Sequence, residues 1–169
     1  MHFAHILFDL DGTLTDPADG ITRSVAHALA KRGIAVPDLR ALHPFIGPPL
    51  IDSFMQFYGF SRDEAVRAVT DYREYYAVRG IFENAVYPGV PEMLRQLKSA
   101  GKWVGMATSK PEPYARQIAD HFGLTPYFDA ICGSLMDESR TAKVDVIAYL
   151  LETHRIVPEQ AVMVGDRCY

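Results

Sequence analysis

Two aspartates, Asp9 and Asp11, follow directly after an apolar run in the segment LFDLDGTLTD, residues 7–16. An apolar run of this length is typical of a buried strand. Carboxylates about 4 Å apart repel each other by about 4 kcal/mol at an effective dielectric constant near 20, so the pair requires a counterion. Mg²⁺ prefers carboxylate oxygens and usually binds one or two of them together with a substrate phosphate. The segment therefore favours metal-assisted phosphoryl chemistry.

The two acids are expected to have different roles at such a site. Asp9 can attack phosphorus and form an aspartyl-phosphate, a known form of covalent catalysis by carboxylates. Asp11 is placed to protonate the leaving oxygen and afterwards to activate the hydrolytic water. Gly12 permits a sharp exit from the strand, which brings backbone N–H groups toward the phosphate.

Other polar residues follow two later apolar runs. Thr108 and Ser109 come after WVGMA, and Asp166 comes after AVMV and one glycine. The carboxyl ends of the strands in an open α/β sheet meet at one rim, where ligands bind. We therefore expect Thr108, with Ser109 beside it, to contact the phosphate and Asp166 to complete the acidic cluster on the metal.

Lys143 stands near the start of the helix that precedes the last strand. We expect it to hold phosphoryl oxygens together with Thr108 and to offset the charge around Asp9. Structural alternatives remain open for several of these residues. A lysine in the first turn of a helix is usually solvated, Thr108 could cap the following helix, and Asp166 could be a turn residue. Ser109 and Lys110 are expected to cap a helix or border the site rather than to carry out the chemistry.

Apolar runs of strand length alternate with amphipathic helices in the second half of the chain. This alternation predicts an α/β fold with a doubly wound, mainly parallel, Rossmann-like core sheet and right-handed crossovers. The predicted strands are 4–8, 103–107, 128–132 and 161–165. One predicted helix ends at Gly101, and two others span about 112–122 and 142–154.

The segment after the first strand is helical throughout by its pattern. Ile21, Val25 and Leu29 form one apolar stripe, and Ser61 and Glu64 have the spacing of a capping box. These helices can bury their own stripes, so we expect an all-helical cap inserted into the core. The predicted core comprises residues 1–15 and 85–169, and the predicted cap comprises residues 16–84.

The motifs DLDGT, ATSK, Lys143 and VGDR, in this order around a helical insertion, resemble those of the haloacid dehalogenase superfamily. The segments FIGPPL and FENAVYPGV extend the resemblance to its phosphatases with a small helical cap, the phosphoglycolate phosphatase and 5′-nucleotidase-like branch. The resemblance implies that Asp9 is the nucleophile and Asp11 the acid/base. It also implies that Thr108 and Lys143 bind phosphate, and that Asp9, the backbone carbonyl of Asp11 and Asp166 hold Mg²⁺.

Two details of the motifs refine this prediction. The dehalogenase branch lacks the second aspartate of the first motif, so Asp11 favours phosphoryl chemistry over carbon–halogen cleavage. The last family motif runs Gly-Asp-x-x-x-Asp, and the chain stops at Tyr169, one residue before the second acid. We therefore expect that a further strand and its helices are missing, and that the 169-residue chain binds metal weakly and turns over slowly.

The leading functional hypothesis is a Mg²⁺-dependent phosphatase for a small phosphomonoester, such as phosphoglycolate or a nucleotide. One alternative is a sugar phosphomutase of the same superfamily, which would return the phosphoryl group to its substrate. Another is a catalytically impaired phosphate-binding relative, or a module phosphorylated on aspartate like a receiver domain. A receiver domain carries its phosphoacceptor on the third strand and has no helical insertion, so Asp9 argues against that alternative.

Composition limits the partners and the compartment. There are 17 Lys and Arg against 21 Asp and Glu, and the resulting net charge of −4 gives no electrostatic case for nucleic acid or an anionic membrane. No apolar run approaches the length of a membrane span. Cys132 and Cys168 are too few for a disulfide framework. We expect a cytoplasmic protein whose partner is a small phosphorylated metabolite; the sequence leaves its oligomeric state open.

Overall fold

The computed structural model describes residues 3–137 and 139–166 of the chain, so Arg167 of the VGDR motif and Cys168 lie outside the described residues. The chain divides into two compact units. The core unit comprises Met1–Asp16 and Val86–Tyr169, and the cap unit comprises Pro17–Ala85. The short strands β2 (Thr15–Asp16) and β3 (Ala85–Val86) pair where the chain passes between the units.

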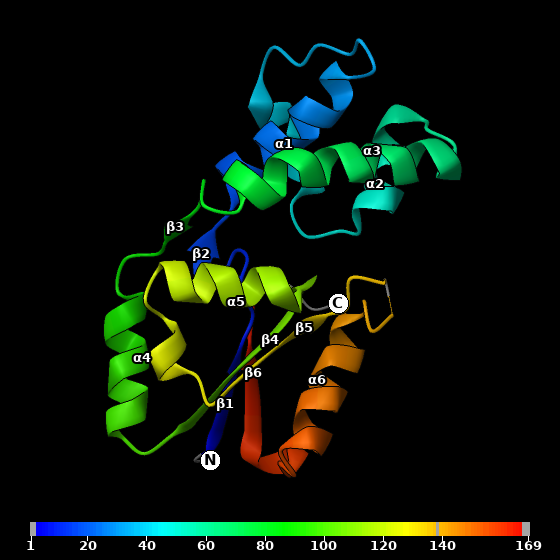
Figure 1. Ribbon diagram of the computed structural model, residues 1–169. Helices are drawn as coiled ribbons and strands as arrows, with labels where there is room; N and C mark the ends of the chain where they lie inside the picture. The colour runs from blue at the N-terminus through cyan, green and yellow to red at the C-terminus, as the bar shows by residue number, and fades with distance from the viewer. Residues whose placement is uncertain (1–2, 138, 167–169) are drawn as a thin grey trace. The chain divides into compact units, whose positions relative to one another are not determined.

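The core unit is built on a parallel sheet of four strands in the order β5-β4-β1-β6 (Figure 1). β1 pairs with β4 on one side and with β6 on the other. Ile6 of β1 lies opposite Val104 of β4 and opposite Val162 of β6. This architecture confirms the predicted fold class. The strands are β1 (His5–Phe8), β4 (Trp103–Pro111), β5 (Ala130–Ser134) and β6 (Ala161–Val164).

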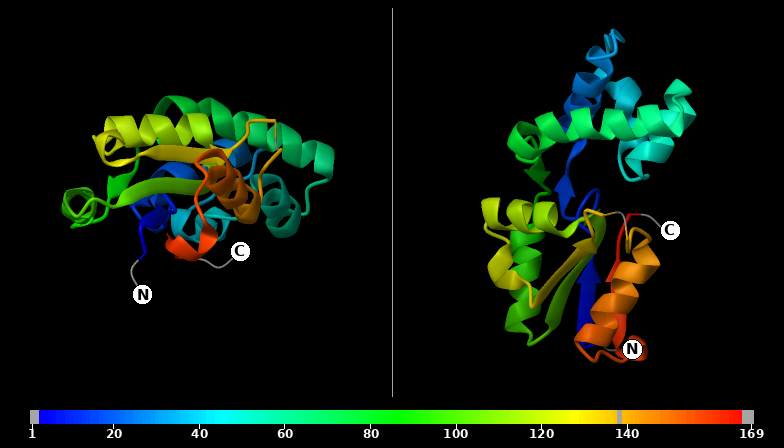
Figure 2. Two further views of the ribbon diagram at one scale, coloured as in Figure 1. Left: turned by 90° about the horizontal axis from the view of Figure 1, so that it is seen from below. Right: turned by 45° about the vertical axis from the view of Figure 1, so that its right-hand side comes forward.

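Three helices connect the strands and cover both faces of the sheet. The path from β1 through β4 to β5 moves toward one edge, and the connection to β6 then returns past β4 and β1 to the other edge. Right-handed crossovers place the helices of the two paths on opposite faces, as Figure 2 shows for α4 and α5 against α6. The helices are α4 (Val90–Ser99), α5 (Glu112–His121) and α6 (Lys143–Thr153).

The alternation of side chains along the strands explains the core. Leu7, Ala107 and Cys132 face α6 and pack against its Val146 and Leu150. Val104 and Met106, which alternate with Ala107 along β4, are also completely buried. Both faces of β4 are therefore apolar, as expected for a parallel sheet covered by helices on two sides.

The cap unit is helical. Ser61 caps α3 and forms the predicted capping box with Glu64, and α2 ends at Gly59 in the left-handed conformation. In another part of the unit a Cβ on Gly20 would lie 1.9 Å from the carbonyl oxygen of Gly80, so only glycine allows this close contact. The elements are α1 (Ala18–Ala30), the 3₁₀ helix η1 (Leu39–Phe45), α2 (Leu50–Tyr58), α3 (Arg62–Tyr75) and the π-helical turn η2 (Tyr76–Gly80).

Two core strands were predicted with the wrong bounds: the strand predicted at 128–132 is β5, Ala130–Ser134, and the second core strand is longer than predicted. The sequence placed the end of the second core strand at residue 107, whereas β4 continues to Pro111. The extension is possible because β4 keeps pairing with β5 after a register shift, from Ala107 opposite Cys132 to Pro111 opposite Ser134. The short strands β2 and β3 and the 3₁₀ turns η3 (Thr125–Tyr127) and η4 (Pro158–Gln160) were also not predicted.

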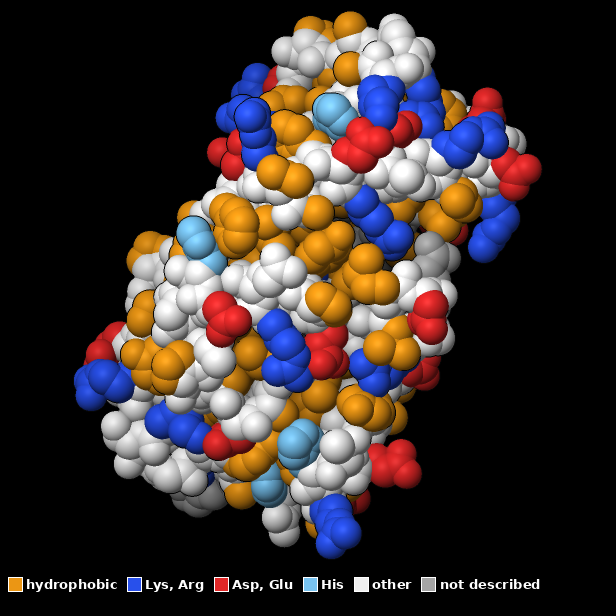
Figure 3. Space-filling view, viewed as in Figure 1, with side chains coloured by type: hydrophobic (Ala, Val, Ile, Leu, Met, Phe, Trp, Pro, Cys, Tyr) orange, Lys and Arg blue, Asp and Glu red, His pale blue; other side chains and the backbone are white. Residues whose placement is uncertain are grey.

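Two further features of the molecule are the apolar length of its helices and the distribution of charge on its surface. No helix in the described part of the chain is both long enough and apolar enough to cross a membrane. On the face that Figure 3 shows, acidic and basic side chains are interspersed within each unit.

Candidate active site

Asp9 stands at the point where the winding of the sheet changes direction. It follows β1, and its N–H donates to the carbonyl of Val164 at the end of β6 (2.9 Å). β4 lies on one side of β1 and β6 on the other, and the chain reaches them by crossovers of opposite direction. Ligands of open α/β sheets bind outside the carboxyl ends of the strands at such a switch point. The fold therefore puts the carboxylate of Asp9, a buried residue, at the expected ligand-binding edge.

The loop after β1 is tightly hydrogen-bonded to itself. The N–H groups of Thr13, Leu14 and Thr15 all donate to the carbonyl of Leu10, and the N–H of Gly12 donates to Thr15. Gly12 has a φ of 79°, which favours glycine over residues with a Cβ. These bonds keep the amides of residues 12–15 within the loop, so a direct phosphate contact from Gly12 remains a prediction.

Asp166, after β6, lies against this loop. Its N–H donates to the Thr13 hydroxyl oxygen (3.1 Å). A Cβ on Gly12 would approach Asp166 Oδ2 to 2.6 Å, which is closer than van der Waals contact allows. The bare backbone of Gly12 thus makes room for the Asp166 carboxylate beside the segment that carries Asp9 and Asp11.

Lys143, the first residue of α6, forms an ion pair with Asp9 through its Nζ and Oδ2. The Lys143 side chain is 11% exposed, so little water screens the pair. The other Asp9 oxygen, Oδ1, accepts a hydrogen bond from the N–H of Leu10 (2.8 Å). Both Asp9 oxygens therefore face donors that hold the carboxylate in one orientation and offset its charge.

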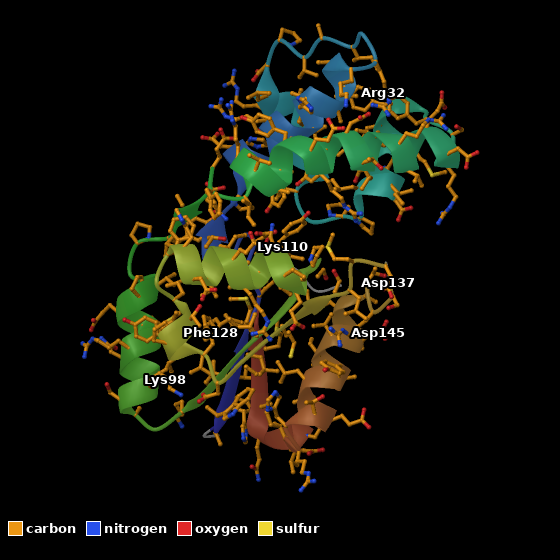
Figure 4. All side chains as sticks on the ribbon, viewed as in Figure 1. Arg32, Lys98, Lys110, Phe128, Asp137 and Asp145 are labelled. Carbon is orange, nitrogen blue, oxygen red and sulfur yellow. The ribbon has the colours of Figure 1, made fainter. Side chains whose placement is uncertain are left out.

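Lys110 forms a second ion pair, with Asp11. Its Nζ lies 2.8 Å from Asp11 Oδ2, and its side chain is only 6% exposed. Figure 4 labels Lys110 near the end of β4 and the start of α5. The sequence treated Lys110 as a helix cap or a border residue and missed this contact. The available signal was a lysine within a few residues of an apolar strand end, but its partner depended on how β4 and β1 align.

Burial and neighbouring charges act on Asp11 in opposite directions. Burial raises the pKa of Asp11 above its ordinary value, whereas the charge and hydrogen bond of Lys110 lower it and only partly offset the effect. The neighbouring Asp9 carboxylate raises the pKa further, and Lys143 lowers it. Asp11 Oδ1 is buried without a hydrogen-bond partner among the described residues. The net effect of these surroundings is a raised pKa at Asp11, with burial as the largest cause.

Thr108 is buried on β4, and its hydroxyl oxygen accepts a hydrogen bond from the N–H of Lys110 (3.2 Å). It does not cap α5, because the N-cap of that helix is Pro111 and no side chain of residues 3–137 or 139–166 forms a cap hydrogen bond there. The capping alternative for Thr108 is therefore wrong. Ser109, the next residue, is half-buried. Contacts of Thr108 and Ser109 with a phosphate remain predictions.

The chain matches a known protein family over most of its length. The profile described as haloacid dehalogenase-like hydrolase matches residues 6–169. The chain belongs to this family of hydrolases. The resemblance inferred from the DLDGT, ATSK and VGDR motifs is thus confirmed.

Individual relatives of this haloacid dehalogenase-like hydrolase carry different names. The chain is 50% identical over its whole length to a 5′-nucleotidase of Pseudomonas aeruginosa and covers 76% of it. It is 43% identical to the tyrosine-protein kinase PtkA of Mycobacterium tuberculosis, with 97% of the chain matched to 56% of the relative. It is 35% identical to a phosphoglycolate phosphatase of Cereibacter sphaeroides, with 95% of the chain matched to 75% of the relative.

A solved structure supports the fold directly. The crystal structure of a predicted phosphatase from Clostridium acetobutylicum superposes with a TM-score of 0.94 at 47% identity. The match covers 99% of this chain and 77% of that one. The parallel sheet and its surrounding helices are therefore those of a haloacid dehalogenase-like hydrolase.

The expected metal ligands follow the carboxyl ends of β1 and β6. The described residues include no group of three or more His, Cys, Asp or Glu side chains arranged to hold a metal ion. The Asp11 carboxylate pairs with Lys110 through Oδ2. The set expected from the family resemblance uses only two carboxylates, of Asp9 and Asp166, with the backbone carbonyl of Asp11. These are hard oxygen donors from one edge of the sheet, and their chemistry fits Mg²⁺.

Proposed function

We propose that this haloacid dehalogenase-like hydrolase is a Mg²⁺-dependent phosphatase that acts through an aspartyl-phosphate on Asp9. The observation that carries the proposal is the pairing of two carboxylates with two separate lysines, Asp9 with the half-buried Lys143 and Asp11 with the buried Lys110. Two acids whose surroundings differ in this way can divide the roles of nucleophile and proton donor.

In the first half of the reaction, the Asp9 carboxylate attacks phosphorus. A bond forms between the Asp9 oxygen and phosphorus while the bond to the ester oxygen breaks. Asp11 is the proposed donor of a proton to the departing oxygen, and burial shifts its pKa in the direction that favours the protonated form. Lys143, already next to Asp9, stabilises negative charge on the transferred phosphoryl group.

In the second half, the same acid acts as a base. Asp11 is then a carboxylate, and the ammonium group of Lys110 at 2.8 Å stabilises it in that form. Asp11 accepts a proton from a water molecule, which attacks phosphorus as the bond to Asp9 breaks. Inorganic phosphate leaves, Asp9 returns to a carboxylate, and Asp11 is again protonated. The two steps together consume one water molecule.

Asp9, the backbone carbonyl of Asp11 and Asp166 are the groups that would hold Mg²⁺. When bound, the ion would supply positive charge to the phosphoryl oxygens. Asp166 supports this role because its N–H bond to Thr13 and its contact with Gly12 fix it beside the loop that carries Asp11.

The proposed substrate is a small phosphomonoester, either nucleotide-like or phosphoglycolate-like, and the proposed compartment is the cytoplasm. The relatives named 5′-nucleotidase and phosphoglycolate phosphatase support the substrate class. The buried Cys132, which is a free thiol, supports a reducing compartment.

The relative named tyrosine-protein kinase favours phosphoryl transfer as a second candidate function. The same aspartyl-phosphate could transfer its phosphoryl group to a hydroxyl group in place of water. A phosphomutase would likewise return it to a sugar. The three outcomes differ only in the acceptor of the second half-reaction.

A panel of phosphate esters with full product analysis tests the proposal. Nucleoside monophosphates, phosphoglycolate, sugar phosphates and a tyrosine-containing peptide with ATP are incubated with the chain and Mg²⁺. Release of inorganic phosphate from a small ester is the expected result. Formation of an isomeric sugar phosphate or of phosphotyrosine without phosphate release would replace hydrolysis by transfer. No reaction with any ester would refute the phosphatase assignment.

A further inference from the structure

Arg140 lies in the loop between β5 and α6, three residues before Lys143. It has a φ of 52°, a left-handed backbone conformation that residues with a Cβ rarely adopt. Such a conformation persists only when surrounding contacts hold it. The Arg140 side chain supplies contacts of this kind, because it is only 14% exposed and reaches three elements of the core unit.

The guanidinium of Arg140 joins these elements in one place. Its Nε and Nη2 both donate to the carbonyl of Gly133 on β5, at 3.1 Å and 2.9 Å. Nη2 also donates to Glu112, the first residue of α5, at 3.4 Å. The guanidinium carbon lies 3.9 Å from the centre of the Tyr149 ring on α6. The planar fork and flat face of arginine suit this combination, whereas lysine could form only part of it.

Glu112 completes the connection on the other side of Gly133. Its carboxylate accepts a hydrogen bond from the N–H of Gly133 (3.3 Å) and another from Arg116 Nη2 (2.8 Å). A Cβ on Gly133 would lie 2.5 Å from the carbonyl oxygen of Lys110, so the two backbones are in direct contact. The end of β5 is therefore held between the start of α5 and the loop that leads to α6.

The start of α6 packs on the sheet through Val146 but has no side-chain cap among the described residues. Its N-cap is Ala142, and no side chain in the described part of the chain forms a cap hydrogen bond there. Asp145 in the first turn, labelled in Figure 4, is exposed and adds a charge but no cap bond. Lys143 is the first residue of this uncapped helix, and its ammonium group must meet Asp9.

We propose that Arg140 is a positioning residue that fixes the first turn of α6 and thereby holds Lys143 against Asp9. The effect on catalysis rests on the function proposed above, whereas the effect on Lys143 itself does not. Both are measured in the full chain, with Arg116 as the matched control. Arg116 also binds Glu112 and a β5 carbonyl, of Ile131, but it lies on α5 and is linked to Arg140 only indirectly, through the Glu112 carboxylate.

The first measurement is independent of activity. The native chain is treated briefly with an amine-acetylating reagent, and the acetylation of each lysine is quantified by mass spectrometry. In Arg140→Ala and Arg140→Gly, Lys143 is expected to react about fivefold faster or more, because its ion pair opens more often. The rate at Lys98, which pairs with Asp129 elsewhere on the core unit, is the internal reference. Arg116→Ala is expected to leave the Lys143 rate unchanged.

The glycine variant separates anchoring from backbone strain. Glycine accepts a φ of 52° without strain but provides no guanidinium. If Arg140→Gly and Arg140→Ala both leave the Lys143 rate at the wild-type value, the proposal is overturned. If neither variant folds, Arg140→Lys tests the proposal in their place, because lysine keeps the positive charge but lacks the forked guanidinium group. The proposal requires an intermediate Lys143 rate in that variant, and a wild-type rate would overturn it.

The second measurement follows turnover of the best ester from the substrate panel. Displacing Lys143 is expected to lower kcat about tenfold in Arg140→Ala, with a smaller change in KM, while Arg116→Ala stays within about twofold. Partial recovery of kcat is expected in Arg140→Lys. A wild-type kcat in Arg140→Ala would overturn the proposal. If the wild-type chain hydrolyses no ester, the proposed function fails, and the acetylation rates still decide the role of Arg140.

Discussion

Lys110 Nζ lies 2.8 Å from Asp11 Oδ2, and the lysine side chain is almost completely buried. A buried pair of this kind contributes little net stability, but removing one partner leaves an uncompensated charge. Lys110→Met is therefore expected to lower the free energy of unfolding by about 3 kcal/mol in urea titrations. Adding Asp11→Asn to Lys110→Met is expected to recover much of this loss.

Lys98→Met is the matched control for that prediction. Lys98 pairs with Asp129 at 2.6 Å, but both side chains are one-third exposed, so the loss is expected to stay below about 1 kcal/mol. Equal losses in the two lysine variants, or no recovery in the double variant, would contradict a buried pair at Asp11.

Asp9→Asn is expected to lower hydrolysis of p-nitrophenyl phosphate by at least about a thousandfold, because the amide cannot attack phosphorus. The folded state is expected to survive, since the amide oxygen can still accept the hydrogen bond that Leu10 donates to Asp9 Oδ1. Circular dichroism checks the fold. Asp145→Asn, which neutralises an acid in the first turn of α6, is the control and is expected to remain active. Retained turnover in Asp9→Asn would remove Asp9 from the nucleophilic role.

Metal removal tests the assignment of Asp166. Activity is expected to disappear in EDTA and to return when Mg²⁺ is added in excess. Asp166→Asn removes one of the two proposed carboxylate ligands, so the Mg²⁺ concentration for half-maximal activity is expected to rise about tenfold or more. EDTA-resistant hydrolysis, or an unchanged Mg²⁺ requirement in Asp166→Asn, would be incompatible with the proposed metal site.

The sequence predicted those features that depend on local pattern. Apolar runs located the four core strands, and the amphipathic stretch after residue 142 located the helix that Lys143 begins. Ser61 and Glu64 formed the expected capping box because its geometry depends on spacing alone. The confirmed α/β fold followed from the alternation of these elements.

Features that depend on the alignment of distant strands could not be predicted. Lys110 meets Asp11 because β4 continues past residue 107 and lies beside β1, and neither fact is encoded by a local pattern. The contact of Gly12 with Asp166 likewise requires β6 to lie next to β1. Arg140 acts through Gly133 and Glu112, which come from two other elements.

Gly12→Ala is expected to impair the site in two ways. The left-handed φ of 79° costs an alanine about 1–2 kcal/mol, and the new Cβ would displace the Asp166 carboxylate. Gly101→Ala is a close control, because Gly101 has a φ of 70° but no heavy atom within 4 Å of its Cβ position. Urea titrations are expected to show similar losses of stability in both variants. Only Gly12→Ala is expected to need more Mg²⁺, and a normal Mg²⁺ requirement would refute the contact with Asp166.

The cap unit has its own pH-dependent contact. Lys31 Nζ and Arg32 Nη1, at the end of α1, each lie 2.7 Å from an oxygen of Asp71 on α3. The hydrogen bond from Lys31, followed by that from Arg32, lowers the pKa of Asp71 despite partial burial. Because the folded-state pKa is below the unfolded value, the pair stabilises the cap above the unfolded pKa of about 4. This contribution is lost as the pH falls through the lower folded-state value.

Asp71→Asn is therefore expected to destabilise the protein by about 1–2 kcal/mol at pH 7, and by progressively less below pH 4. Urea titrations at pH 7, pH 4 and about pH 2.5, followed by far-ultraviolet circular dichroism, measure the difference. Glu92→Gln is the control, since Glu92 pairs with Arg95 on the exposed surface of α4 and its removal is expected to leave the midpoint unchanged. A deficit of Asp71→Asn that is the same at all three pH values would show that the carboxylate charge does not hold α1 and α3 together.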